Sequence, residues 1–172
     1  MLVTLVLVLS YAVRGLGLLR RCSIPTAAMA PAIIPGDCVT MEGFTYLVRE
    51  PRRGEIVVFK TDGIESLPPG QLYVKRLAGL PGESVRLAEG KLYINGRHIA
   101  LSNALGQIEY LAPPHSALRL PPAKIPPGEF FVLGDNATNS LDSRFWGTVP
   151  RANIQGKVAF RYWPLSRSGR VK

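Results

Sequence analysis

The sequence predicts a mostly β protein: an antiparallel β-sheet or barrel that follows an N-terminal apolar membrane segment. Short apolar runs alternate with turn residues along most of the chain, and no helical period connects them. The chain also holds 15 prolines and 17 glycines among its 172 residues, which is too many for a helical bundle. This length suits one domain with a real hydrophobic core. We therefore expect a single β-rich domain over residues 21–172.

The first segment of the chain is the candidate membrane anchor. Residues 1–13 are almost wholly apolar, and Arg14 interrupts the run. A full bilayer crossing needs about 20 such residues, so a short or trimmed anchor, a cleavable signal peptide and a buried strand all compete. No basic residue precedes the run, which argues against a signal peptide. We expect an anchor over residues 1–20, although Arg20 and Arg21 taken alone would place the domain in the cytoplasm.

Strand patterns follow one another from Ser23 onwards. Asn95-Gly96 is the strongest two-residue hairpin signal of the chain, and Ala88-Glu89-Gly90 marks a second hairpin. Residues 101–127 contain three Pro-Pro pairs and show no clear period, so we expect a long surface excursion there and not a separate domain. The predicted strands are residues 37–41, 55–60, 71–77, 84–87, 91–94, 97–100, 129–133 and 157–163.

The charge of the chain limits the classes of partner that it is expected to bind. Twenty-one Lys and Arg against twelve Asp and Glu give a formal charge of +9, which suits either nucleic acid or an anionic membrane surface. The basic residues are scattered and form no nucleic-acid motif. We therefore expect membrane lipids as a partner and no nucleic acid.

Histidines and cysteines are too few for the common metal and triad sites. His98 and His115 are the two histidines of the chain, so a zinc site or a His-based triad has little to build on, and we expect no metal and no cofactor. Cys22 and Cys38 lack C-x-x-C spacing. Two unpaired, partly buried thiols are the simpler interpretation. A disulfide between Cys22 and Cys38 is the alternative that the sequence leaves open.

Three stretches of the chain carry the residues that suggest chemistry. The first reads Ile24-Pro25-Thr26-Ala27-Ala28-Met29-Ala30-Pro31, followed by Gly36-Asp37. The second reads Arg53-Gly54-Glu55-Ile56-Val57-Val58-Phe59, followed by Tyr73-Val74-Lys75-Arg76-Leu77-Ala78-Gly79-Leu80-Pro81-Gly82-Glu83. The third reads Gly134-Asp135-Asn136-Ala137-Thr138-Asn139-Ser140-Leu141-Asp142-Ser143-Arg144-Phe145-Trp146-Gly147. Together they resemble the bacterial type I signal peptidases, membrane-tethered Ser/Lys endopeptidases, in that family's order and from about residue 14 to about residue 164.

Lys75 is the candidate general base. A lysine with the ordinary pKa of about 10.4 is a cation and cannot accept a proton. Burial in an apolar pocket lowers that pKa, and the neutral amine can then act as a base. On a strand Tyr73, Lys75 and Leu77 share one face, while Arg76 points to the other. A lysine whose stem lies along a sheet edge is the structural alternative, and it would be preferred without the flanking resemblance.

The resemblance implies roles for the residues around Lys75. Ser140 would hydrogen-bond the Lys75 amine and orient it. The Thr26 hydroxyl and the backbone N–H of residue 28 would stabilise the oxyanion of the acyl-transfer reaction.

Polar residues of the third stretch are the expected structural support. Asp142 and Arg144 are two residues apart, so on an extended segment they share a face and could form a charge pair, with Asp135 as a further member. Asn136 is also predicted to support the structure of the site. The alternative is a Gly-, Asp- and Asn-rich turn with solvated charges.

Position 28 breaks the family pattern, because the resemblance requires a nucleophilic serine where the chain has Ala28. Ser23 and Thr26 cannot substitute, since one residue along a strand is about 3.3 Å and a misplacement of about 1 Å can cost about a hundredfold in rate. We therefore expect the chain as written not to cleave peptide bonds appreciably. Either a serine has been replaced, or the chain is a natural non-catalytic homologue that binds signal peptides.

The family removes N-terminal signal peptides from exported preproteins, so the resemblance implies signal peptides as partners and an exported, membrane-anchored β-rich peptidase domain. The substrate would be an extended segment with small residues at the first and third positions before the cut, bound as an added strand. Ile33, Ile34, Phe44 and Tyr46 are candidates for membrane contact, with ordinary core packing as the alternative. A self-cleaving Ser/Lys repressor, a non-enzymatic binding module and a nucleic-acid binder are the rival functions.

Overall fold

The computed structural model describes residues 18–103, 106–110 and 124–171. Its strands are β1 (Leu19–Ser23), β2 (Cys38–Glu42), β3 (Ile56–Lys60), β4 (Leu72–Gly79), β5 (Val85–Ala88), β6 (Lys91–Ile94), β7 (Arg97–Ile99), β8 (Ser102–Asn103), β9 (Gly106–Gln107), β10 (Glu129–Leu133), β11 (Val149–Pro150) and β12 (Ile154–Trp163). Its helices are short: α2 (Thr45–Val48) and α3 (Ser143–Trp146), with 3₁₀ turns η1 (Ala137–Asn139), η2 (Arg151–Asn153) and η3 (Leu165–Arg167).

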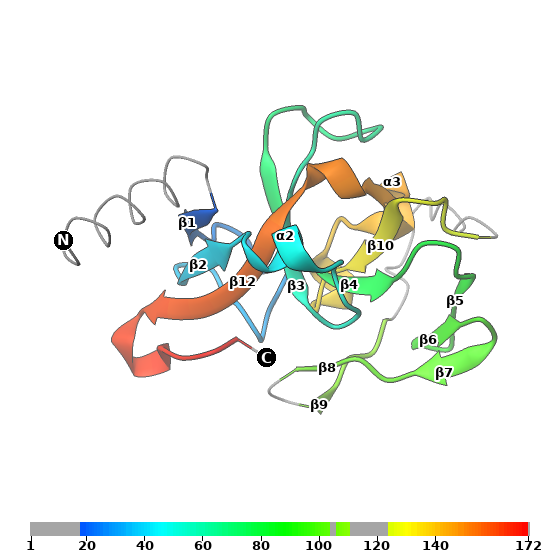
Figure 1. Cartoon of the computed structure of the whole chain (residues 1–172). Helices are drawn as coiled ribbons and strands as arrows, with labels where there is room; N and C mark the ends of the chain where they lie inside the picture. Colours follow the sequence, from blue (N-terminus) through cyan, green and yellow to red (C-terminus); the bar gives the residue numbers. More distant parts are fainter. Residues whose placement is uncertain (1–17, 104–105, 111–123, 172) are drawn as a thin grey trace.

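The strands form antiparallel sheets, which confirms the predicted fold class (Figure 1). The main sheet has seven strands in the order β1-β2-β12-β3-β4-β10-β11. A three-stranded sheet, β5-β6-β7, and a two-stranded one, β8-β9, follow β4 along the chain. The predicted strand at 129–133 coincides with β10. Asn95 (φ 50°) and Gly96 (φ 77°) both have the positive φ of a type I′ turn, so the predicted hairpin is confirmed.

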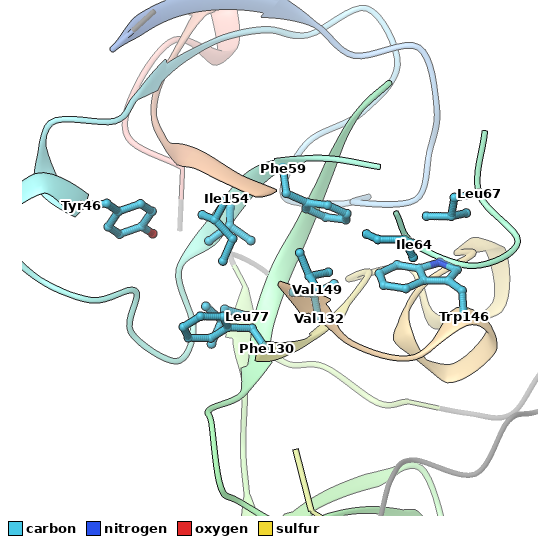
Figure 2. Packing of buried hydrophobic residues seen from close by; sticks show 11 residues of the cluster. Tyr46, Phe59, Ile64, Leu67, Leu77, Phe130, Val132, Trp146, Val149 and Ile154 are labelled. Atoms are coloured by element: carbon cyan, nitrogen blue, oxygen red, sulfur yellow. The ribbon is translucent and has the colours of Figure 1, made fainter. Parts of the chain in front are cut away.

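Side chains alternate between the two faces of the main sheet. Along β3, Val57 and Phe59 enter one hydrophobic cluster, whereas Ile56 and Val58 enter another on the opposite face. Figure 2 shows the first cluster, which runs from Tyr46 at one end to Leu67 and Trp146 at the other. The second cluster lies beneath the chain that connects β1 and β2, and it thereby positions the segment that contains residue 28.

Both ends of the predicted Pro-rich excursion pack into the core. Leu101, Ile108, Tyr110 and Ile125 are buried in a third cluster together with residues of β4, β10 and the small sheet. The expectation of a surface segment therefore fails at these positions, because apolar residues without a strand or helix period still fill the space beside the main sheet. Residues 111–123 lie outside the described part of the chain.

β1 was not among the strands that the residue pattern predicted, although the resemblance implied that a first strand begins near Arg14. Residues 1–17, most of the predicted anchor, lie outside the described residues. Arg20 and Arg21 belong to β1 and so to the folded sheet. Among the described residues, no helix is long and apolar enough to span a bilayer.

Two of the four candidates for membrane contact are core residues. Ile33 is fully buried and Tyr46 is buried in the cluster of Figure 2, whereas Phe44 is 50% exposed and Ile34 is partly buried. The two cysteines are free. Cys22 pairs with Val39 and Cys38 pairs with Ser23 across β1 and β2, so the two thiols point to opposite faces of the sheet.

Candidate active site

The segment that carries Ala28 is a compact loop between β1 and β2. Its neck is closed by two backbone hydrogen bonds, from the Ile24 N–H to the Asp37 carbonyl (2.9 Å) and from the Gly36 N–H to the Ile24 carbonyl (2.9 Å). Inside the loop, the Ile33 N–H donates to the Met29 carbonyl (2.9 Å). We call residues 25–36 the position-28 loop.

Lys75 lies in β4, opposite Val57 of β3. Its side chain is buried, with 5% of the residue exposed, and the amine lies 5.8 Å from the centre of the Tyr73 ring. Among the described residues it forms neither a hydrogen bond nor an ion pair. Burial lowers the pKa of the Lys75 amine to about 8, and the nearby Asp142 and Asp135 carboxylates only partly offset this effect. A lysine in this state is neutral in a large fraction of molecules near pH 8.

One cavity brings the two main candidates together. Thr26, Ala28 and Lys75 all line a pocket of about 520 Å³, and Asn139 and Leu141, the neighbours of Ser140, line it too. Half of its lining residues lie between Arg21 and Met29, and β3 and β4 add the apolar side chains of Val58, Leu72, Tyr73 and Val74. A second cavity, of about 730 Å³, is lined by none of the predicted site residues. Position 28 and the buried lysine therefore line the same pocket.

Ser140 lies beside this pocket but does not bond Lys75. Its hydroxyl is buried and has no hydrogen-bond partner among the described residues, so the hydrogen bond implied by the resemblance is not formed. Its surroundings are set by Gly134. A Cβ atom at Gly134 would overlap the Ser140 side chain and would lie 2.6 Å from the Ala28 carbonyl oxygen. Ser140 and residue 28 therefore approach each other across a position that only glycine fits.

Replacing Gly134 by alanine is expected to displace Ser140, residue 28 or both. Such overpacking typically costs about 1–3 kcal/mol of unfolding free energy, and both contacts lie at the candidate site. We expect a lower melting temperature and a weakened ability of the pocket to bind peptide. Gly63→Ala is the matched control, because its Cβ would meet nothing within 4 Å, although its positive φ (70°) carries a cost of its own. Equal peptide binding by Gly134→Ala and Gly63→Ala would contradict this interpretation.

Asp142 and Arg144 form the expected charge pair, but in a different local structure. The Arg144 Nε donates to Asp142 Oδ1 at 2.8 Å and its Nη2 donates to Oδ2 at 2.9 Å, with both side chains buried. The segment is not extended as predicted: Asp142 caps α3 by accepting from the Arg144 N–H. Asp142 also accepts from the Gly134 N–H (2.9 Å), so the pair holds the start of the loop that faces residue 28.

Asp135 joins a different arginine from the one predicted. Both of its carboxylate oxygens accept from Arg76, at 2.7 Å each, and neither side chain is exposed. Burial raises the pKa of Asp135, and the Arg76 guanidinium opposes that shift. Arg76 is on the other face of β4 from Lys75, as the strand pattern predicted, and it ties β4 to the loop after β10.

Asn136 has a role that its sequence position did not reveal. Its backbone N–H donates to the Ala28 carbonyl (3.1 Å), and its side-chain amide donates to the Ala27 carbonyl (3.2 Å). These two bonds attach the third stretch directly to position 28. Among the described residues, no three His, Cys, Asp or Glu side chains gather as metal ligands.

Known proteins are similar to this chain over most of its length. Residues 1–163 match the family model described as "Signal peptidase, peptidase S26". The chain is 40% identical to a probable signal peptidase I-2 of Synechocystis sp. over 85% of this chain and 64% of that protein. It is 37% identical to a signal peptidase I of Leptolyngbya laminosa over 86% of this chain and 70% of that protein.

A solved structure is also similar: a signal peptidase I from Enterococcus faecalis V583, 32% identical, with a TM-score of 0.46 over 64% of this chain and 97% of that chain. The match to the family model extends from the first residue past the end of the last predicted motif. The chain therefore belongs to the signal peptidase family, peptidase S26.

Proposed function

We propose that this fold is built to remove signal peptides from exported preproteins by a Ser/Lys dyad, and that Ala28 leaves the present chain able to bind such peptides but not to cut them. The observation that carries the proposal is the shared pocket, which position 28 and the buried, unpaired Lys75 both line. A serine at position 28 would be the nucleophile. Lys75 would accept its proton and later return it to the leaving amine.

The developing oxyanion needs hydrogen-bond donors. Thr26 lines the pocket with a side chain that is exposed, so its hydroxyl is free to turn towards a bound carbonyl. The backbone N–H of residue 28 is the second donor in this scheme. Neither donor depends on the side chain at position 28, and so the chain with Ala28 retains them.

The substrate would lie in the pocket as an extended segment. Its cavity of about 520 Å³ is bounded by β4 residues and by the position-28 loop, which suits a strand added between them. Small residues before the cut fit because bulkier ones would meet the buried Met29 and Ala28 side chains.

Membrane lipids are the second proposed partner. The large apolar side chains that are at least 50% exposed lie on two parts of the described surface: on and before α2 (Phe44, Leu47 and Val48) and at the end of β12 and in η3 (Trp163 and Leu165). Exposed apolar side chains of this kind favour contact with a bilayer. Arg20 and Arg21 belong to a strand, so they do not count as a loop in the positive-inside rule, and we place the domain on the exported side.

Ala28 itself favours a second candidate, a natural signal-peptide-binding homologue without catalysis. The test compares the chain with its Ala28→Ser variant on a preprotein in detergent solution. Cleavage by the serine variant alone supports the peptidase. Cleavage by neither chain, with signal-peptide binding retained by both, favours the binding homologue.

A further inference from the structure

The position-28 loop has a front and a rear attachment. At the front, Asn136 holds the carbonyls of Ala27 and Ala28. At the rear, only three to four residues further along the loop, the carbonyls of Pro31 and Ala32 accept hydrogen bonds from the C-terminal part of the chain. We expect a shift at the rear to displace position 28, because the loop is short and internally bonded.

Two arginines make the rear attachment. The Arg161 Nη1 of β12 donates to the Ala32 carbonyl at 2.8 Å, and the Arg167 Nη2 of η3 donates to the Pro31 carbonyl at 3.3 Å. Both guanidinium groups also donate to the Asp37 carboxylate. The Arg167 Nη1 lies 3.0 and 3.1 Å from its two oxygens, and the Arg161 Nη1 lies 3.4 Å from Oδ2.

Asp37 lies at the neck of the loop and is 1% exposed. Besides the two arginines, it accepts from the Ile34 N–H at 3.0 Å, inside the loop itself. A buried carboxylate requires such partners, since removal of one leaves an uncompensated charge. Asp37, Arg161 and Arg167 therefore all bond to the rear half of the position-28 loop or to each other beside its neck.

The arginines are themselves held in place. Arg161 and Gly169 exchange two backbone hydrogen bonds (2.8 and 2.9 Å), and the Arg161 side chain also donates to the Arg167 carbonyl. The chain beyond β12 is therefore folded back so that η3 faces the position-28 loop.

We propose that Arg167, together with Arg161, is a positioning residue that sets the place of residue 28 relative to Lys75. This inference rests on the proposed peptidase function. Arg167 also lies beyond residue 163, where the match to the family model ends. A planar guanidinium suits the task, because it donates to a carboxylate and to a carbonyl at once, which a lysine ammonium does with less geometric control.

Kinetics of Ala28→Ser variants test the proposal. Arg167→Gln is expected to lower kcat by about 10- to 100-fold, as a displacement of about 1 Å does, with KM changed less than about threefold. Arg170→Gln is the matched control, because Arg170 is in the same tail, is exposed, and forms no hydrogen bond or ion pair with Asp37 or the loop among the described residues. Guanidinium ion at millimolar concentration is expected to restore part of the kcat of Arg167→Gly. Unchanged kcat in Arg167→Gln, or an equal loss in Arg170→Gln, would overturn the proposal.

A second measurement needs no activity. In the chain with Ala28, Arg167→Gln is expected to speed hydrogen exchange of the Ile33 and Gly36 amides, while the Val58 amide in the central sheet keeps its protection. Unchanged exchange in the loop would overturn the positioning role even if no serine variant cleaves. Faster exchange together with inactive serine variants would support the rear attachment by Arg167 and refute the peptidase function alone.

Discussion

A chain with Ala28→Ser is expected to cleave a preprotein at its signal-peptide junction, faster than the chain with Ala28 by a factor on the order of 10⁶, the effect known for removal of a serine nucleophile. The chain already has three features that this reaction would use: the pocket, the buried Lys75 amine, and the Asn136 bonds that hold residue 28. In the proposed mechanism, the serine oxygen is the group that Ala28 lacks. Mass spectrometry of the two products, in detergent, measures the rate and locates the cut.

Ala27→Ser is the matched control for this experiment. It adds the same hydroxyl one residue away, at a partly exposed position of the same loop. Because a shift of one residue moves the oxygen by about 3 Å, Ala27→Ser is expected to remain inactive. Equal activity of the two serine variants, or cleavage by the chain with Ala28, would show that position 28 does not carry the nucleophile.

Lys75→Met in the Ala28→Ser chain is expected to lower kcat by about 10²- to 10⁴-fold, the contribution typical of a general base. Methionine keeps a similar apolar stem, so the packing beside Tyr73 and Val57 is retained. Lys60→Met is the control, since Lys60 is an exposed lysine at the end of the neighbouring β3. Equal losses in the two variants would contradict a specific role for Lys75.

The same variant has an expected effect on stability, with a defined sign. The pKa of Lys75 is lower in the folded state than in the unfolded chain, so the unfolded state binds more protons at intermediate pH. The cost of burying the cation is fully present below pH 8 and disappears as the pH rises towards the unfolded value. Lys75→Met should therefore raise the melting temperature more at neutral pH than near pH 10.

Local patterns in the sequence were sufficient to predict much of the fold. The strand at 129–133 and the Asn95-Gly96 turn depend on neighbouring residues, and both were found where predicted. β1 was missed because Leu19–Ser23 is a mostly polar edge strand, without the apolar alternation of a half-buried one.

The candidate site was harder to predict where it depends on distant partners. The burial of Lys75 agreed with its strand pattern. The partner of Asp135, in contrast, is Arg76, which is 59 residues away. A pair so distant in the chain cannot be predicted from the spacing of neighbouring residues. The α3 cap at Asp142 could have been predicted from the sequence, because Asp is a common residue at the start of a helix.

Ser140 is the clearest difference between the expected and the observed site. Its hydroxyl is buried without a partner and does not reach Lys75. The Ala28→Ser chain would add a hydroxyl to the pocket that Lys75 lines, beside Ser140. The resemblance implied a role for Ser140 at Lys75, but the position of the Ser140 side chain depends on Gly134 and on the loop that carries Ala28.

The pH dependence of kcat/KM for the Ala28→Ser chain tests most directly whether the buried lysine is the base. This parameter reports the ionisation of the free protein, and the pKa of Lys75 is about 8. Below that pH the amine is a cation and cannot accept the serine proton; above it the amine is neutral. We predict that kcat/KM rises tenfold per pH unit on the acid side and levels off above about pH 8. A rate that is flat from about pH 6 upwards, or one that falls across this range, would contradict a Ser/Lys dyad built on Lys75.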